Sequence, residues 1–191
     1  MDRRLLIPIF TLILGALIVG TLASFSKHPQ PSAPISLDDK EWRLLINGFV
    51  QHPLNLTLEE LAAMHKSIVD AKLYCVDNPR TPVTQGNWTG VRLELLLEDA
   101  GVASEAVKVA FYASDGYTTD LTVTTAMRDD IIIAYARNGE PLPETLRLVV
   151  PGKWGYKWIS ELTHIELVNY DFKGTWESRG YTDEADIPSN S

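Results

Sequence analysis

The sequence predicts an α+β domain, made of mainly β mixed sheets with short flanking helices. Apolar runs with the length of strands recur at short intervals from residue 42 to residue 170, whereas only two segments carry clear helical signals. No long helix regularly separates one apolar run from the next, as a doubly wound parallel sheet would require. We therefore expect more strands than helices.

The first elements of the domain are predicted by local signals. The stretch WRLLINGFV (42–50) favours a strand, or a tight hairpin around its Asn-Gly pair. Thr57 and Glu60 have the spacing of a capping box, which predicts a short helix through Met64.

The next elements surround the single cysteine. Residues 69–75 are strand-like, and the Pro-containing stretch after Cys75 is expected to be a loop. Residues 91–100 have leucines at helical spacing and are followed by Gly101, which predicts a helix with a C-terminal stop. Further strands are expected at 107–113, 121–124, 131–136, 146–150 and 165–170.

The composition suits one globular domain plus an accessory segment. The chain has 191 residues, of which 45% are hydrophobic and 22% are charged. The net charge is -8 and the pI is about 5.0, with no cluster of Lys or Arg in the folded part. A nucleic-acid surface needs the opposite charge, so we expect no nucleic-acid partner.

Residues 1–25 are expected to form an N-terminal membrane anchor or a signal. Leu5–Phe25 has no charge and follows two arginines, and its length suffices for a transmembrane helix. The arginines predict that the domain lies on the extracytoplasmic side, periplasmic or extracellular. A cleaved signal is the alternative, although the apolar run is longer than the roughly 7–15 residues usual for signals. Residues 26–40 favour a Pro-rich tether, so the folded domain is expected at 41–191.

Cys75 is the only cysteine, so it cannot form an intramolecular disulfide. It stands where an apolar run meets an irregular stretch, which is a common place for functional groups. A lone thiol is also often just a small buried apolar side chain. Zinc is not favoured, because the sequence has no second cysteine and no closely spaced pair of histidines. A thiol enzyme that uses Cys75 as its nucleophile stays open.

Several long motifs follow one another in a recognisable order. They are LYCVDNPRTP, NWTGVRLELLLEDAG, VKVAFYASDGYTTDLTV, AYARNGEPLP, LRLVVPGKWGYKWISELTHIEL and GTWESRGY. Together they resemble the molybdopterin-binding domain of the sulfite oxidase superfamily, in its small single-domain, membrane-anchored form. The resemblance implies a mainly β fold with flanking helices and a molybdopterin cofactor that carries molybdenum (Mo).

The resemblance also implies where the cofactor binds. The thiolate of Cys75 would ligate the metal, Asp115 would contact the cofactor, and Arg147 would hold the pterin phosphate. A charge within an otherwise apolar strand is costly unless it is paired, which independently favours an anion at Arg147. Further cofactor contacts are implied at Asn78, Ser114, Lys157, Trp158, Ile159 and Ser160. Ser160 departs from the family pattern, because many members have a lysine there.

Two more residues resemble active-site residues of sulfite oxidases. Arg80 lies five residues after the cysteine, and Tyr181 lies five residues after Trp176. If both reach the metal, the guanidinium would hold an oxyanion or a dipolar oxide, and the phenol would donate a hydrogen bond to the transferred oxygen.

The sequence is compatible with three functions. The first is a molybdopterin-dependent oxidoreductase that exchanges an oxygen atom with a small oxyanion, S-oxide or N-oxide. Its partners would be a small-molecule substrate, a separate electron-transfer protein such as a cytochrome or a membrane redox subunit, and the membrane through the N-terminal helix. The second is a cofactor-free binding or accessory module, and the third is the thiol enzyme.

Overall fold

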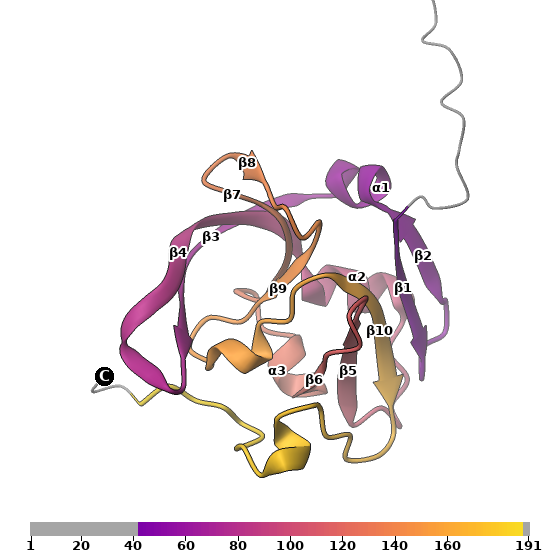
Figure 1. Cartoon of the computed structure of the whole chain (residues 1–191). Coiled ribbons are helices and arrows are strands. Elements are labelled where there is room, and N and C mark those ends of the chain that lie inside the picture. The colour runs from indigo at the N-terminus through magenta and orange to yellow at the C-terminus, as the bar shows by residue number, and fades with distance from the viewer. Residues whose placement is uncertain (1–41, 189–191) are drawn as a thin grey trace, which may run out of the picture. The chain divides into compact units, whose positions relative to one another are not determined.

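The computed structural model describes residues 42–188, which form two β-sheets with a few short helices (Figure 1). The anchor and tether predicted for residues 1–40 lie outside the described residues. Within residues 42–188, no helix has both the length and the apolar character needed to cross a membrane.

The first sheet has mixed strand directions, as predicted. Its order is β2-β1-β10-β5-β6, in which β1 runs parallel to β10 and the other neighbours are antiparallel. The strands are β1 (Arg43–Gly48), β2 (Leu54–Thr57), β5 (Lys108–Ala113), β6 (Thr118–Thr122) and β10 (Leu162–Val168).

The second sheet has the order β3-β4-β7-β8, and β9 pairs with β7. Its longest part is the β3–β4 hairpin, a curved pair of strands in Figure 1 that turns at residues 76–77, where Cys75 is the register partner of Asn78. The strands are β3 (Lys66–Cys75), β4 (Asn78–Arg92), β7 (Ile132–Arg137), β8 (Glu140–Pro141) and β9 (Arg147–Val149).

Two predicted helices are present with the predicted end signals. α1 (Leu58–Ala63) begins with the capping box, in which Glu60 N donates to Thr57 Oγ1 at 3.0 Å and Thr57 N donates to Glu60 Oε2 at 2.8 Å. α2 (Leu93–Ala100) ends at Gly101, whose φ of 66° is left-handed.

One hydrophobic core joins the two sheets. The inward side chains of both sheets and the buried face of α2 belong to a single cluster of buried residues. Among its largest fully buried members are Trp88, Phe111, Leu44, Ile46, Leu93 and Ile132. Because both sheets share this core, they hold the loops that connect their strands in fixed positions.

Three local predictions were wrong. The stretch after Cys75 is the strand β4 instead of a loop, and Pro82 lies where the pairing with β3 changes register, a place that tolerates proline. Residues 91 and 92 belong to β4 because they pair with β7. The strand expected at 121–124 ends at Thr122, whose side chain caps α3 (Val123–Ala126).

β1 is a strand, but its Asn-Gly pair does not form a tight hairpin. β1 pairs with β2 across the longer connection 49–53. Gly48 has a φ of 87°, and an added Cβ would lie 2.2 Å from Leu167 O of β10. The glycine is therefore required by close packing against the neighbouring strand.

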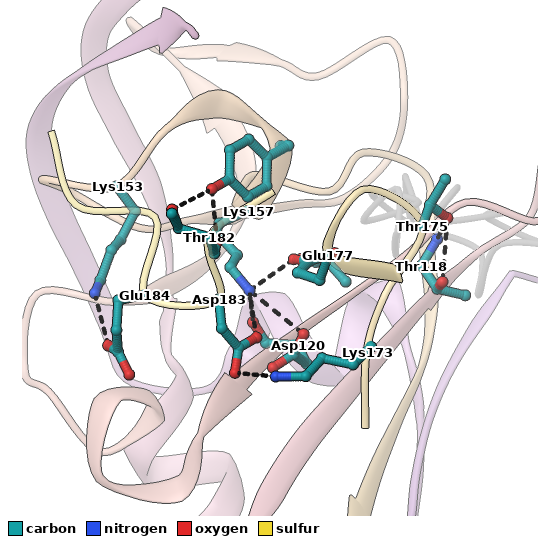
Figure 2. A network of polar contacts seen from close by, with 12 residues as sticks. Thr118, Asp120, Lys153, Lys157, Lys173, Thr175, Glu177, Thr182, Asp183 and Glu184 are labelled. Carbon is teal, nitrogen blue, oxygen red and sulfur yellow. Dashed lines mark hydrogen bonds and ion pairs between the residues drawn. The ribbon is translucent and has the colours of Figure 1, made fainter. Parts of the chain in front are cut away.

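Residues 169–188, here called the C-terminal segment, are attached to β5 and β6 by a cluster of buried charges (Figure 2). Lys108 Nζ lies 2.5 Å from Asp120 Oδ2 and 2.6 Å from Asp183 Oδ2. The side chains of Lys108 and Asp120 are only 5% and 1% exposed. Lys173 Nζ adds a contact of 2.8 Å to Asp183 from the surface. Charges so poorly hydrated are tolerated only when paired.

The pairing changes the proton affinities of these groups. Burial alone would lower the pKa of Lys108, but its hydrogen bonds to Asp120 and Asp183 raise it above the usual value for lysine. Burial would raise the pKa of Asp183, yet the hydrogen bonds from Lys108 and Lys173 hold it well below its usual range. Both groups are therefore charged at neutral pH.

Replacing Asp183 by Asn should lower the free energy of unfolding at neutral pH and make it less sensitive to acid. The folded-state pKa of Asp183 is depressed, so its contribution is present above the unfolded-state value of about 3.9 and is lost as the pH falls below it. The side chain is 27% exposed, so solvent screens the loss to about 1–2 kcal/mol. Urea unfolding near neutral pH and near pH 3 measures both effects.

The matched control is Glu184→Gln, which removes the same charge from a carboxylate that is 65% exposed in the same segment and leaves Lys153 its nearer partner, Asp186, at 2.9 Å. It should change the free energy of unfolding by less than about 0.5 kcal/mol. A wild-type curve and an Asp183→Asn curve that stay equally far apart on acidification would contradict the assignment of this ion pair.

Candidate active site

A cleft of about 390 Å³ lies beside the single cysteine. Its lining comes from the tip of the β3–β4 hairpin, the turn between β5 and β6, β9, the loop 154–160 and the C-terminal segment. The predicted site residues that line it are Cys75, Asp115, Arg147, Trp158, Ile159, Ser160 and Tyr181. Its volume falls within the roughly 300–1,000 Å³ usual for ligand pockets.

Cys75 is the last residue of β3 and is half-buried. Gly155 lets the loop 154–160 approach β3 immediately before this thiol. An added Cβ at Gly155 would lie 2.9 Å from both Tyr74 O and Leu73 Cδ2. A glycine is thus needed for the loop and the thiol to share one cleft.

Arg147 on β9 supplies the positive charge of the cleft. Its Nε donates to Glu144 Oε1 at 2.7 Å, and its Nη1 donates to Trp158 O at 3.0 Å. A guanidinium has five N–H groups, so these two contacts orient Arg147 and leave donors for an anionic ligand.

Asp115 lies in the turn between β5 and β6. Its Oδ1 accepts a hydrogen bond of 2.8 Å from Tyr117 N, and Gly116 has a φ of 86°. The turn directs Tyr117 into the cleft, where its hydroxyl donates to Tyr156 O at 2.6 Å. The sequence motif SDGY thus provides both a carboxylate and a phenol.

Trp176 and Tyr181, here called the aromatic wall, close the cleft from the C-terminal segment. Their ring centroids are 5.1 Å apart in an edge-to-face contact, and Tyr156 packs against Tyr181 at 5.5 Å. The hydroxyl of Tyr181 has no hydrogen-bond partner within residues 42–188, so it is available to a bound molecule.

Four predicted site residues do not line the cleft. Asn78 and Arg80 are exposed on β4. Ser114 donates to Glu161 Oε2 at 2.5 Å and faces a smaller neighbouring pocket. Lys157 is completely buried, and its ammonium group is held by the charges beneath the C-terminal segment.

Sequence reasoning did not assign a role to several residues that line the cleft. The aromatic ones are Tyr117, Tyr156 and Trp176, and Asp77 and Val83 come from the hairpin. Tyr117 had a signal, because an Asp-Gly turn reverses the chain and brings the next side chain beside the carboxylate. Val83 had none, since a strand was not expected there.

The electrostatics of the cleft favour neutral hydrogen-bond donors. Burial raises the pKa of Tyr117 and of Tyr156 above the usual value for tyrosine, so both phenols stay protonated. The charged residues of the lining are Asp77, Asp115 and Arg147. None of the described residues that line the cleft is a histidine, the usual activator of a nucleophilic thiol.

Comparison with known proteins identifies the family of the chain. The family described as oxidoreductase molybdopterin binding domain matches residues 30–176. An uncharacterized oxidoreductase, YuiH of Bacillus subtilis, is 33% identical over 162 aligned residues, and the match covers 83% of this chain and 81% of that protein.

Other relatives are longer proteins. The protein-methionine-sulfoxide reductase catalytic subunit MsrP of Gluconobacter oxydans is 30% identical, and the match covers 78% of this chain and 51% of the relative. Mitochondrial sulfite oxidase of Drosophila melanogaster is 28% identical, with 76% and 30% covered. The chain thus spans about half of the length of the first of these relatives and less than a third of the second.

A solved structure shows the same fold. The sulfane dehydrogenase SoxCD from Paracoccus pantotrophus superposes with a TM-score of 0.63 at 25% identity, covering 71% of this chain and 40% of that chain. The chain therefore belongs to the family of oxidoreductase molybdopterin-binding domains of the sulfite oxidase superfamily, and it is an oxidoreductase that depends on the molybdenum cofactor.

Proposed function

We propose that the domain exchanges an oxygen atom with a small substrate at a molybdenum centre that Cys75 ligates. The observation that supports this proposal is the composition of the cleft. The half-buried thiol of Cys75, the guanidinium of Arg147 with unused donors, and the loop that Gly155 allows against β3 all line it. A soft thiolate suits molybdenum, and Arg147 suits a phosphate.

The residues present fit the cofactor. Cys75 would hold the metal, Arg147 the pterin phosphate, and Asp115 together with the loop 158–160 the pterin. When bound, the cofactor supplies two dithiolene sulfurs and a metal that changes oxidation state as an oxygen atom is exchanged. A single protein thiolate would then suffice, which would explain why Cys75 has no partner cysteine.

The chain's own residues orient the substrate and exclude water. The aromatic wall and Tyr156 surround the cleft with apolar ring surface. The hydroxyl of Tyr181 would donate a hydrogen bond to the oxygen that is transferred. Because the pKa of Tyr117 is raised, its phenol acts as a neutral donor that supports the loop.

The charges of the cleft favour a neutral, dipolar S-oxide or N-oxide over a small oxyanion. Asp77 and Asp115 would repel an anion, and the free donors of Arg147 would be taken by the pterin phosphate. Arg80, which would have held an oxyanion, is exposed on β4 outside the cleft. Three relatives have protein-methionine-sulfoxide reductase in their names, which is compatible with this substrate class.

Electrons would come from a separate redox protein, since reduction of an oxide needs an external donor. We also propose that Leu5–Phe25 anchors the domain at the extracytoplasmic face of a membrane, because this run is uncharged and follows two arginines.

Cys75→Ser should remove one sulfur neighbour from the metal. The protein is expressed in a host that makes the cofactor, and X-ray absorption at the molybdenum edge is compared with that of the wild type. Ser114→Ala is the matched control, because Ser114 bonds Glu161 outside the cleft, and it should leave the spectrum unchanged. An unchanged sulfur count in Cys75→Ser would contradict the ligation. Wild-type protein without molybdenum, but with alkylation-sensitive turnover, would favour the thiol enzyme.

Tyr181→Phe should lower kcat/KM for the best substrate by about 30-fold to 1,000-fold, because one donor to the transition state is lost. Arg80→Ala should change it less than about threefold, because solvent screens an exposed charge. Turnover is measured with an artificial electron carrier for sulfite, a sulfoxide and an N-oxide, at equal molybdenum content. If Arg80→Ala is the more damaging substitution and sulfite the better substrate, the oxyanion alternative is correct.

Protease added to intact cells or right-side-out vesicles should digest the domain while residues 5–25 stay with the membrane. The uncharged run predicts retention, and the arginines before it predict the orientation. Complete protection of the domain, or its release after processing near residue 26, would contradict the uncleaved anchor.

A further inference from the structure

Lys157 belongs to the loop that lines the cleft, but its side chain lies on the opposite side of that loop. The next residues, Trp158, Ile159 and Ser160, all line the cleft. The ammonium group of Lys157 is completely buried instead among three carboxylates, from Asp120 on β6 and from two residues of the C-terminal segment (Figure 2).

The distances show which contact dominates. Lys157 Nζ lies 2.6 Å from Glu177 Oε1, 2.9 Å from Asp120 O and 3.7 Å from Asp183 Oδ1. The side chains of Lys157 and Glu177 are both 0% exposed. Thr119 Oγ1 donates a second hydrogen bond to Glu177 Oε1 at 2.7 Å. Neither charge can rely on water, so the pair is held in one geometry.

We propose that Lys157 is a positioning residue, which sets the aromatic wall of the cleft through its ion pair with Glu177. Glu177 directly follows Trp176 and begins the short 3₁₀ turn η2 (Glu177–Arg179). Tyr181 N donates to Trp176 O at 3.2 Å, so this turn carries both rings. A displacement of Glu177 therefore displaces Trp176 and Tyr181 together.

The same segment is seated on β6 by shape as well as by charge. An added Cβ at Gly174 would lie 2.5 Å from Thr119 Cα and 2.7 Å from Thr118 O, both in the backbone. Thr175 N donates to Thr118 O at 2.9 Å. The backbone contacts at residues 174 and 175 and the ion pair at Glu177 thus act at neighbouring points of the chain. The turn that bears the aromatic wall begins at Glu177.

This role differs from cofactor binding by the side chain, which the family resemblance implied for Lys157. It rests on the proposed function in one respect only, namely that the aromatic wall serves the substrate. The attachment of the wall can be measured without any metal.

The test compares Lys157→Met with Gly174→Ala and with the control Lys173→Met. Lys157→Met removes the buried charge but keeps an unbranched side chain of nearly the same length, and Gly174→Ala disturbs the same seating without changing any charge. Lys173 is 39% exposed and contacts Asp171 and Asp183 of the same segment, so its substitution removes an equal charge from the surface. Hydrogen exchange is measured by mass spectrometry on the full chain, with the amides of β4 and β7 as internal reference.

In Lys157→Met and Gly174→Ala, amides of residues 174–182 should exchange at least about tenfold faster, while the reference strands stay protected. Lys173→Met should change them less than about threefold. Molybdenum content should be retained. Introduced into the wild-type chain, Lys157→Met should lower kcat/KM at least about tenfold. Introduced into Tyr181→Phe, it should lower kcat/KM little, because its effect acts through the ring of Tyr181 and the hydroxyl that the ring carries.

Three results would overturn the proposal. Loss of molybdenum with an unchanged exchange rate in residues 174–182 would make Lys157 a cofactor ligand. Equally faster exchange in β4 and β7 would make it a residue of general stability. Unchanged exchange together with unchanged kcat/KM would show that the ion pair does not position the wall.

A wild-type protein without molybdenum would contradict the proposed function alone, and the exchange measurement would still decide the positioning role.

Discussion

The pairing of two buried lysines with carboxylates is the constraint on which the cleft depends. Lys108 and Lys157 lie beneath the C-terminal segment, and both are almost inaccessible to water. A charge in such a place needs partners, and these come from β6 and from the segment itself. Because the segment also carries Trp176 and Tyr181, the electrostatics of the interior decide where one wall of the site stands.

The opposite side of the cleft is set by backbone geometry. Cys75 ends a long strand of the second sheet, so its position follows from the pairing between β3 and β4. Gly155 then allows the loop 154–160 to come against that strand. A thiol on a paired strand is held more firmly than one on a free loop, which suits the proposed role as a metal ligand.

The environment of Cys75 also distinguishes among the functions carried forward. A nucleophilic cysteine is commonly activated by a histidine or by nearby cations. The described lining of the cleft instead has two aspartates, one arginine already bonded to Glu144, and a ring of aromatic side chains. This lining fits the proposed role of Cys75 as a metal ligand better than a role as a nucleophile, and it places neutral donors around the cleft.

The sequence by itself determined the features that local patterns encode. The capping box at Thr57 and the stop at Gly101 specify helix ends within a few residues, and both were predicted correctly. The order of the motifs around Cys75 indicated the family, because family identity depends on residue types at fixed spacing. Seven of the predicted site residues line one cleft, because they were identified from the same motifs of residue types at fixed spacing.

Only the tertiary structure decided which way the remaining side chains point. Lys157 stands in a motif that contacts the cleft, yet its charge is neutralised by Asp120 and Glu177, which are distant in sequence. Arg80 was expected over the metal, but the stretch after Cys75 forms β4 and leaves it exposed. The orientation of a charged side chain depends on the free energy of its ion pairs with residues distant in sequence and on the cost of removing it from water. Neither free energy can be obtained from the local spacing of residues.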